Sequence, residues 1–134
     1  MAMAFDLVAA GTQVTANGEG VPVDVSGSAT RTFLVTMQID EVIEQESLDL
    51  AVLGSADGTN WAPMPILRLP QRFYRGETRM VLDLTVKPEV KHIRARWTLN
   101  RWGRVAPTPM FVFGVRCAEV AASKQAKPKA VASA

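Results

Sequence analysis

The chain has few of the residue types that catalytic and metal sites need. Its 134 residues include one cysteine, Cys117, and one histidine, His92. A single cysteine excludes a disulfide within the chain and any multi-cysteine metal site. His92 falls on the polar face of a predicted strand, and no spacing implies that a nucleophile and an orienting acid converge on it. We therefore expect an ordinary surface histidine, no cofactor, no metal site and no enzymatic activity.

Long apolar runs are also absent. No apolar segment reaches the roughly 20 residues that a membrane-spanning helix needs, so we expect no membrane partner. Residues 1–6 do not show a basic stretch followed by an apolar one, and the sequence predicts no secretion signal. With 48% apolar and 21% charged residues, the composition indicates one globular domain, which we place at residues 1–120. Residues 121–134 are small, basic and without a core pattern, and are expected to form a flexible Ala/Lys/Pro tail.

Alternation of apolar and polar residues dominates the body of the chain. A period of two is typical of half-buried strands. It recurs in residues 21–25, 32–39, 80–86, 92–99 and 111–117, and further strands are expected from Phe5 and from Pro63. About eight short strands separated by Gly, Pro and Asn predict an all-β domain, a single antiparallel β-sandwich of jelly-roll type. Trp61, Trp97 and Cys117 are in phase with apolar neighbours, and we expect them in the core.

The most specific local pattern is the run from Leu53 to Trp61. Gly58 can adopt a positive φ, while Asp57 and Asn60 can hydrogen-bond their own backbone. Because apolar residues alternate just before it, this run predicts a β-hairpin turn, with Trp61 at the start of the next strand.

Acidic and basic residues are unevenly distributed, although the net charge is only +2. Residues 1–60 hold nine acidic residues against Arg31 alone, a net charge of −8. Residues 61–116 hold eleven basic residues against three acidic ones, a net charge of +8. One interpretation is that interleaved strands neutralise these charges within the fold. The other is that an acidic and a basic surface attract each other between subunits or toward a partner.

The acidic segment 40–47 is interpreted as a solvated loop. Calcium binding is the alternative, but nothing in the sequence fixes the loop geometry that calcium requires. Its carboxylates would come from Asp40, Glu41, Glu44 and Glu46.

Two predicted loops, residues 68–76 and 100–104, combine arginine with aromatic residues. Arg, Tyr and Trp are enriched at interaction hot spots, since they join a large contact area to directional bonding. The alternative interpretation is that Phe73 and Trp102 cap the core beneath these loops. We expect a partner-binding surface formed by Arg72, Phe73, Tyr74, Arg75, Arg101, Trp102 and Arg104. A nucleic-acid partner is disfavoured, because the chain is nearly neutral and no recognition helix is predicted.

The run Gly54–Trp61 resembles a turn of small β-sandwich accessory proteins of tailed bacteriophages, of the head-decoration or cement type. Residues 7–30, the strand at 92–97 and the last strand at 111–113 are similar to other parts of these proteins, so spaced fragments over residues 5–118 carry the resemblance. The two arginine-aromatic loops and the tail depart from the pattern. The resemblance implies a structural protein of a virion or phage-like particle, made in the bacterial cytoplasm. Such a protein would form a homo-oligomer or decorate a capsid-like shell.

The same turn also resembles that of discoidin-type carbohydrate-binding sandwiches. This second resemblance implies a glycan-binding module, in which Trp102, Tyr74 or Trp61 would form an exposed stacking platform.

Overall fold

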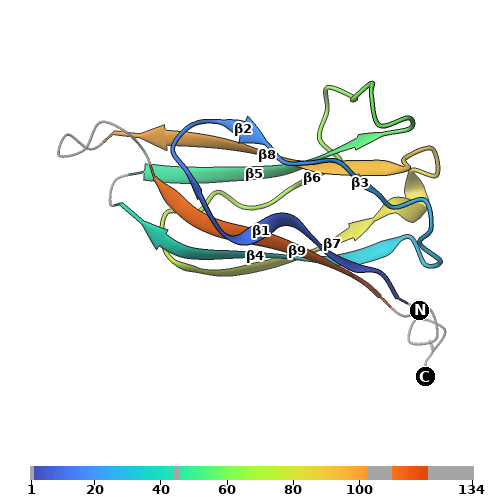
Figure 1. Cartoon of the computed structure of the whole chain (residues 1–134), viewed down its shortest axis with the longest axis horizontal. Helices are drawn as coiled ribbons and strands as arrows, with labels where there is room; N and C mark the ends of the chain where they lie inside the picture. Colours follow the sequence, from blue (N-terminus) through green and yellow to red (C-terminus); the bar gives the residue numbers. More distant parts are fainter. Residues whose placement is uncertain (1, 44–45, 103–109, 121–134) are drawn as a thin grey trace.

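The computed structural model describes residues 2–43, 46–102 and 110–120 of the chain. Its strands form two antiparallel sheets packed face to face (Figure 1). The elements in chain order are β1 (Ala4–Val14), β2 (Gly18–Glu19), β3 (Val23–Asp24), β4 (Thr32–Val42), β5 (Glu46–Ser55), β6 (Leu67–Arg68), β7 (Gly76–Asp83), the 3-10 turn η1 (Leu84–Val86), β8 (His92–Arg101) and β9 (Phe111–Glu119).

The two sheets have jelly-roll connectivity. One sheet has the order β1-β9-β4-β7 and the other has β2-β8-β5-β6, with β3 continuing β2 along β8. The first strand therefore pairs with the last, β2 and β3 pair with β8, β4 pairs with β7, and β5 pairs with β6. A long antiparallel ribbon rolled up in this way is a jelly roll. The predicted fold class is thus confirmed, with β2 and β3 acting as one interrupted strand.

The core lies between the two sheets and is built by the alternation seen in the sequence. On β4, Phe33, Val35, Met37 and Ile39 are at most 1% exposed, and the residues between them are more exposed. Cys117 on β9 is fully buried, as predicted, and burial raises the pKa of its thiol to about 12. The largest side chains that are fully buried are Phe33, Phe111, Phe113, Met37, Ile39, Leu48, Leu50, Leu82, Leu84 and Ile93.

Two predictions from the alternation are wrong at the ends of strands. β7 stops at Asp83, whose carboxylate accepts a 2.9 Å hydrogen bond from the Thr85 N–H and starts η1. Val86, expected on the strand, is therefore 72% exposed. Val21, expected to share a buried face with the residues after it, is 78% exposed, because the backbone leaves β8 between β2 and β3.

The turn after β5 has the predicted chemistry. The Asp57 carboxylate accepts a 2.8 Å hydrogen bond from the Asn60 N–H, and Gly58 has a φ of +80°. These backbone bonds, led by that of Asn60, hold the pKa of Asp57 below its usual range. However, only a single bridge at Trp61 closes the turn, and the strand expected from Pro63 is reduced to β6.

The two tryptophans expected in the core lie at its margin instead. Trp61 is half-buried, and its ring lies under the Arg94 guanidinium at 5.1 Å from the ring centroid. Trp97 is also half-buried and packs edge-to-face on Phe113, with the centroids 5.8 Å apart. Both rings therefore remain partly exposed to solvent at the margin of the core.

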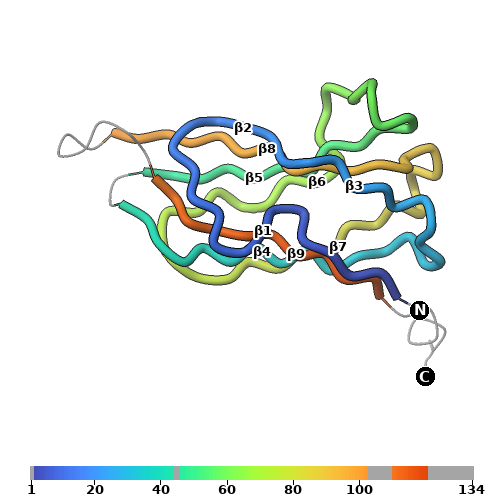
Figure 2. Tube along the Cα trace, viewed as in Figure 1, coloured from blue at the N-terminus to red at the C-terminus, as the bar shows by residue number. Residues whose placement is uncertain are grey.

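β1 leaves the regular ladder in its middle and arches over β9 (Figure 2). Its pairing with β9 shifts register between Asp6 and Val8 and again between Val8 and Thr12. A Cβ atom on Gly114 of β9 would lie 2.7 Å from the Ala10 Cα. The close approach of the arch therefore requires glycine at this position.

Candidate interaction surface

The two basic-aromatic loops meet at the end of the sandwich where β4 passes to β5. The Phe73 ring lies edge-to-face on Trp102, with centroids 6.0 Å apart, and is tilted against Tyr74 at 6.3 Å. We call these three residues the aromatic cluster. Phe73 is 37% exposed, Trp102 56% and Tyr74 76%. Phe73 and Trp102 are thus exposed and do not form a buried cap on the core.

The loop that carries Phe73 and Tyr74 is held at its start by Arg72. The backbone of Arg72 exchanges two hydrogen bonds with Leu48 of β5, of 2.8 and 3.0 Å. Its Nε donates a 2.8 Å hydrogen bond to the Thr78 hydroxyl on β7. Because both the backbone and the guanidinium are anchored, the loop presents its aromatic rings from a fixed base.

Two hollows flank this loop. One, of about 290 Å³, lies between the loop and the start of β7. The other, of about 690 Å³, is lined by Asp40, Glu41 and Val42 together with Tyr74 and Arg75. Tyr74 and Arg75 line both hollows. A partner that contacts the cluster would therefore meet one cationic side chain beside an acidic rim.

Arg101 does not lie open on this surface, in contrast to the prediction. Its side chain is 4% exposed, and its Nη1 lies 3.8 Å from Oε1 of the fully buried Glu46. The Glu46 carboxylate also accepts hydrogen bonds from the N–H groups of Ile43 (2.8 Å) and Met110 (2.9 Å). Arg101 is therefore part of a buried latch that joins the ends of β4, β5, β8 and β9 near the cluster.

The solvated acidic loop expected at residues 40–47 is consequently wrong at both ends, because residues 40–42 belong to β4. β5 begins at Glu46, and both Glu46 and Ser47 are buried. A signal was present in the sequence, since Glu46 is in phase with the core residues Leu48 and Leu50. Glu44 of the same segment and Arg104 of the predicted surface lie outside the described residues.

The uneven charges of the sequence are brought together by the fold. Strands from the acidic and the basic segment alternate within each sheet, so acids of the first segment meet arginines of the second. Three ion pairs of this kind are Asp6–Arg116 (3.4 Å), Glu19–Arg94 (3.7 Å) and Glu46–Arg101 (3.8 Å). Neutralisation within the fold therefore accounts for part of the charge split.

His92 lies on β8, as predicted, but it is half-buried where a solvated side chain was expected. A Cβ atom on Gly58 would lie 3.1 Å from the His92 Cδ2, so the ring packs against the turn after β5. Its Nδ1 is buried without a hydrogen-bond partner. His92 thus contributes packing beside the turn, at a distance from the aromatic cluster along the same strand.

No protein-family model matches the chain, and no curated protein is significantly similar to it. Within residues 2–43, 46–102 and 110–120, no group of three or more His, Cys, Asp or Glu side chains could hold a metal ion. The same ranges contain no helix that is long and apolar enough to cross a bilayer. The aromatic cluster is therefore the feature from which a function can be argued.

Proposed function

We propose that this protein is a non-catalytic structural assembly protein. It self-associates, or decorates a virion-like or phage-like shell, through the aromatic cluster together with Arg72 and Arg75. The observation that carries the proposal is the contact of Phe73 with Trp102, by which two loops far apart in the sequence form one exposed surface. Aromatic residues beside arginine are the composition of interaction hot spots.

The exposure of the cluster supports a partner. Three neighbouring aromatic side chains, each more than a third exposed, form an apolar patch of the kind that marks interaction sites on soluble proteins. Arg75 has no ion pair among the described residues, and Asp40 and Glu41 line the hollow beside it. The matching surface would carry an apolar projection with charged groups of both signs around it.

The jelly roll is compatible with this role but does not decide it. Jelly rolls build viral capsid proteins and also lectin domains, so the fold accommodates both functions weighed from the sequence. The choice between assembly and glycan binding therefore depends on the loops at the end of the sandwich.

The test is the mass of the protein in solution, measured by light scattering after size exclusion over a concentration series at low and high salt. We expect an oligomer or larger particles whose mass falls in Phe73→Ser and in Trp102→Ser. Met64→Ser is the matched control, because Met64 is also exposed (72%) but lies in the loop after β5. Unchanged mass in both cluster variants would contradict the cluster as the contact surface. A monomer at every concentration would leave only decoration of a foreign shell.

Glycan binding is the second candidate. Tyr74 and Trp102 are the two most exposed rings of the cluster and flank Phe73, an arrangement in which sugar rings can stack. Trp61, named above as a third platform residue, is half-buried beneath Arg94 and offers less free ring surface. Titration with a panel of polysaccharides should then quench tryptophan fluorescence, and Trp102→Ala should remove the response. No quenching with any member of the panel would eliminate this function.

A further inference from the structure

The described strands form four open sheet edges, and three of these carry features that prevent pairing with another chain. β1 is interrupted by its arch, the opposite edge is split into the two-residue strands β2 and β3, and β6 is two residues long with Pro70 close behind. Bulges, short strands and proline all blunt sheet edges. β7 has none of these three features, since its eight residues pair with β4 in one uninterrupted register and include no proline. Its edge does carry charged residues, but of both signs: Glu77, Arg79 and Asp83.

The backbone of β7 offers hydrogen-bonding groups at this edge. The Leu84 N–H donates a 2.7 Å bond to the Arg31 carbonyl, just before β4. Because the backbone groups of an antiparallel strand alternate in direction, the even-numbered residues of β7 turn toward β4. The odd-numbered residues Glu77, Arg79, Val81 and Asp83 therefore turn their N–H and C=O groups toward the open edge.

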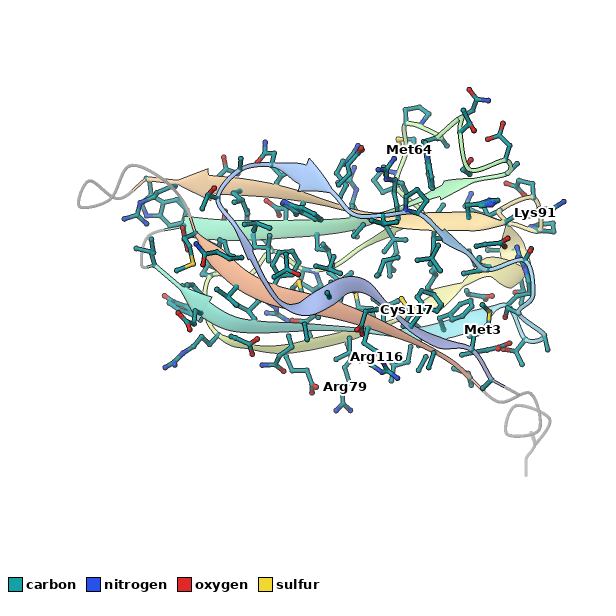
Figure 3. The ribbon with its side chains drawn as sticks, viewed as in Figure 1. Met3, Met64, Arg79, Lys91, Arg116 and Cys117 are labelled. Carbon is teal, nitrogen blue, oxygen red and sulfur yellow. The ribbon has the colours of Figure 1, made fainter. Side chains whose placement is uncertain are left out.

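The side chains of these same residues lie on the outer face of the sheet. Val81 is 56% exposed, although it stands in the middle of the strand. Figure 3 shows Arg79 pointing away from the sandwich. Arg79 pairs with Glu77 of its own strand at 3.0 Å, an exposed contact of the kind that contributes little to stability. An incoming strand would thus find an exposed apolar residue with exchangeable charges around it.

We propose that the β7 strands of two copies pair antiparallel about a twofold axis at Val81. The pairing joins two four-stranded sheets into one continuous sheet across a dimer. This inference rests on the proposed function of assembly and names a second copy of the chain as one of its partners.

Charge complementarity supports this register. With the axis at Val81, Arg79 lies opposite Asp83 of the second copy, and Asp83 lies opposite its Arg79. Opposite charges across a strand pair stabilise it, and the exposed Val81 side chains cover each other. All three facing pairs use residues whose backbone groups already turn toward the edge, so the ladder closes without distortion of β7.

Neighbouring registers are less favourable. An axis at Arg79 would set two guanidinium groups opposite each other, and an axis at Met80 would set Glu77 opposite another carboxylate. An axis at Thr78 would pair opposite charges but would set Val81 opposite Arg75, which lies before β7 on the far side of Gly76. The φ of Gly76 is +144°, outside the range of an extended strand.

The dimer would place its two aromatic clusters far apart. β7 begins directly after Tyr74 and Arg75, and Val81 on the axis lies five positions after Gly76. At about 3.4 Å per residue, the two Gly76 positions lie about 34 Å apart at opposite ends of the paired strands. A dimer of this form presents one cluster at each end and can link two neighbouring positions of an assembly.

Cysteine cross-linking tests the register. We expect Val81→Cys to form a disulfide-linked dimer under mild oxidation, because facing residues of this kind have Cα atoms about 5.5 Å apart, within disulfide range. Glu77→Cys is the matched control on the same strand and face, since its two copies would lie about 27 Å apart. The native Cys117 is buried and does not compete. No cross-link in Val81→Cys, or equal cross-linking in both variants, overturns the proposal.

A second pair of variants separates this edge from the aromatic cluster. Because the aromatic cluster is also proposed to mediate association, Val81→Pro is introduced into the Phe73→Ser background. Val81→Pro removes an N–H that faces the open edge and no bond to β4, so we expect this double variant to be a folded monomer in light scattering. Phe73→Ser should keep the dimer and lose only larger particles. A dimer that persists in the double variant overturns the edge pairing, whereas larger particles that persist in Phe73→Ser contradict the proposed function alone. If Val81→Pro fails to fold, the cross-linking pair still decides.

Discussion

Replacing Glu119 by glutamine should destabilise the fold at neutral pH, although the side chain keeps its size. Glu119 is 8% exposed at the end of β9 opposite to the aromatic cluster. Its Oε1 accepts a hydrogen bond from the Met3 N–H (2.9 Å). Its Oε2 accepts from the Ser28 hydroxyl (2.6 Å), the Thr30 N–H (2.8 Å) and the Thr30 hydroxyl (3.1 Å). Glutamine has one accepting oxygen, so its amide N–H₂ would face a donor on one of the two sides.

The size of the effect follows from the pKa of Glu119. Burial raises this pKa, but the hydrogen bonds from Ser28, Thr30 and Met3 together lower it by more. The net result is a decrease from 4.5 to about 2. A difference of this size corresponds to about 3 kcal/mol of unfolding free energy. Because the pKa is lower in the folded state, the ionised carboxylate stabilises the fold fully above its unfolded pKa. The contribution is lost as the pH falls from about 5 through 2.

Urea unfolding of the wild-type protein and of Glu119→Gln between pH 2 and 7, followed by tryptophan fluorescence, measures this contribution. At pH 7 the variant should lose about 2–3 kcal/mol of unfolding free energy at an unchanged m value. The difference should shrink toward pH 2. Glu89→Gln is the control, because Glu89 is exposed. A loss that stays constant across the pH range, or an equal loss in the control, would refute the reasoning.

Three further predictions concern packing, the buried latch and the thiol. Gly114→Ala places a Cβ atom 2.7 Å from the backbone of β1 and should cost about 1–3 kcal/mol of unfolding free energy. Gly27→Ala, which meets no atom within 4 Å, should not, and equal losses would contradict the close approach. Arg101→Met deprives the buried Glu46 of its guanidinium and should lower the unfolding free energy by about 3 kcal/mol in the same assay; a change under 1 kcal/mol would argue against the latch. The Cys117 thiol, with its pKa raised to about 12, should react with a disulfide reagent at pH 8 only as the protein unfolds, and rapid labelling of the native state would contradict its burial.

Local sequence patterns were sufficient to predict the class of the fold and most of the core. Period-two alternation predicts which face of a strand is buried, and it predicted the buried residues of β4, β8 and β9 together with Cys117. The turn around Asp57 and Gly58 was equally readable, because its hydrogen bonds join residues two or three positions apart. The alternation failed as a guide at Val86, because the Asp83 cap ends the strand although the alternation in the sequence continues.

Which residues far apart in the sequence come into contact could not be predicted and follows from the three-dimensional fold. The rings of Phe73 and Trp102 touch because the jelly roll brings the end of β8 beside the loop before β7, and neither loop alone carries that information. The two loops were therefore predictable as candidates, whereas their union and the withdrawal of Arg101 to Glu46 were not. The edge position of β7 was likewise not predictable, since apolar and polar residues alternate in the same way in an edge strand and in a central strand. Alternation and turn chemistry depend on neighbours in the chain, while partners across a sheet depend on the order and register of strands that long-range packing selects.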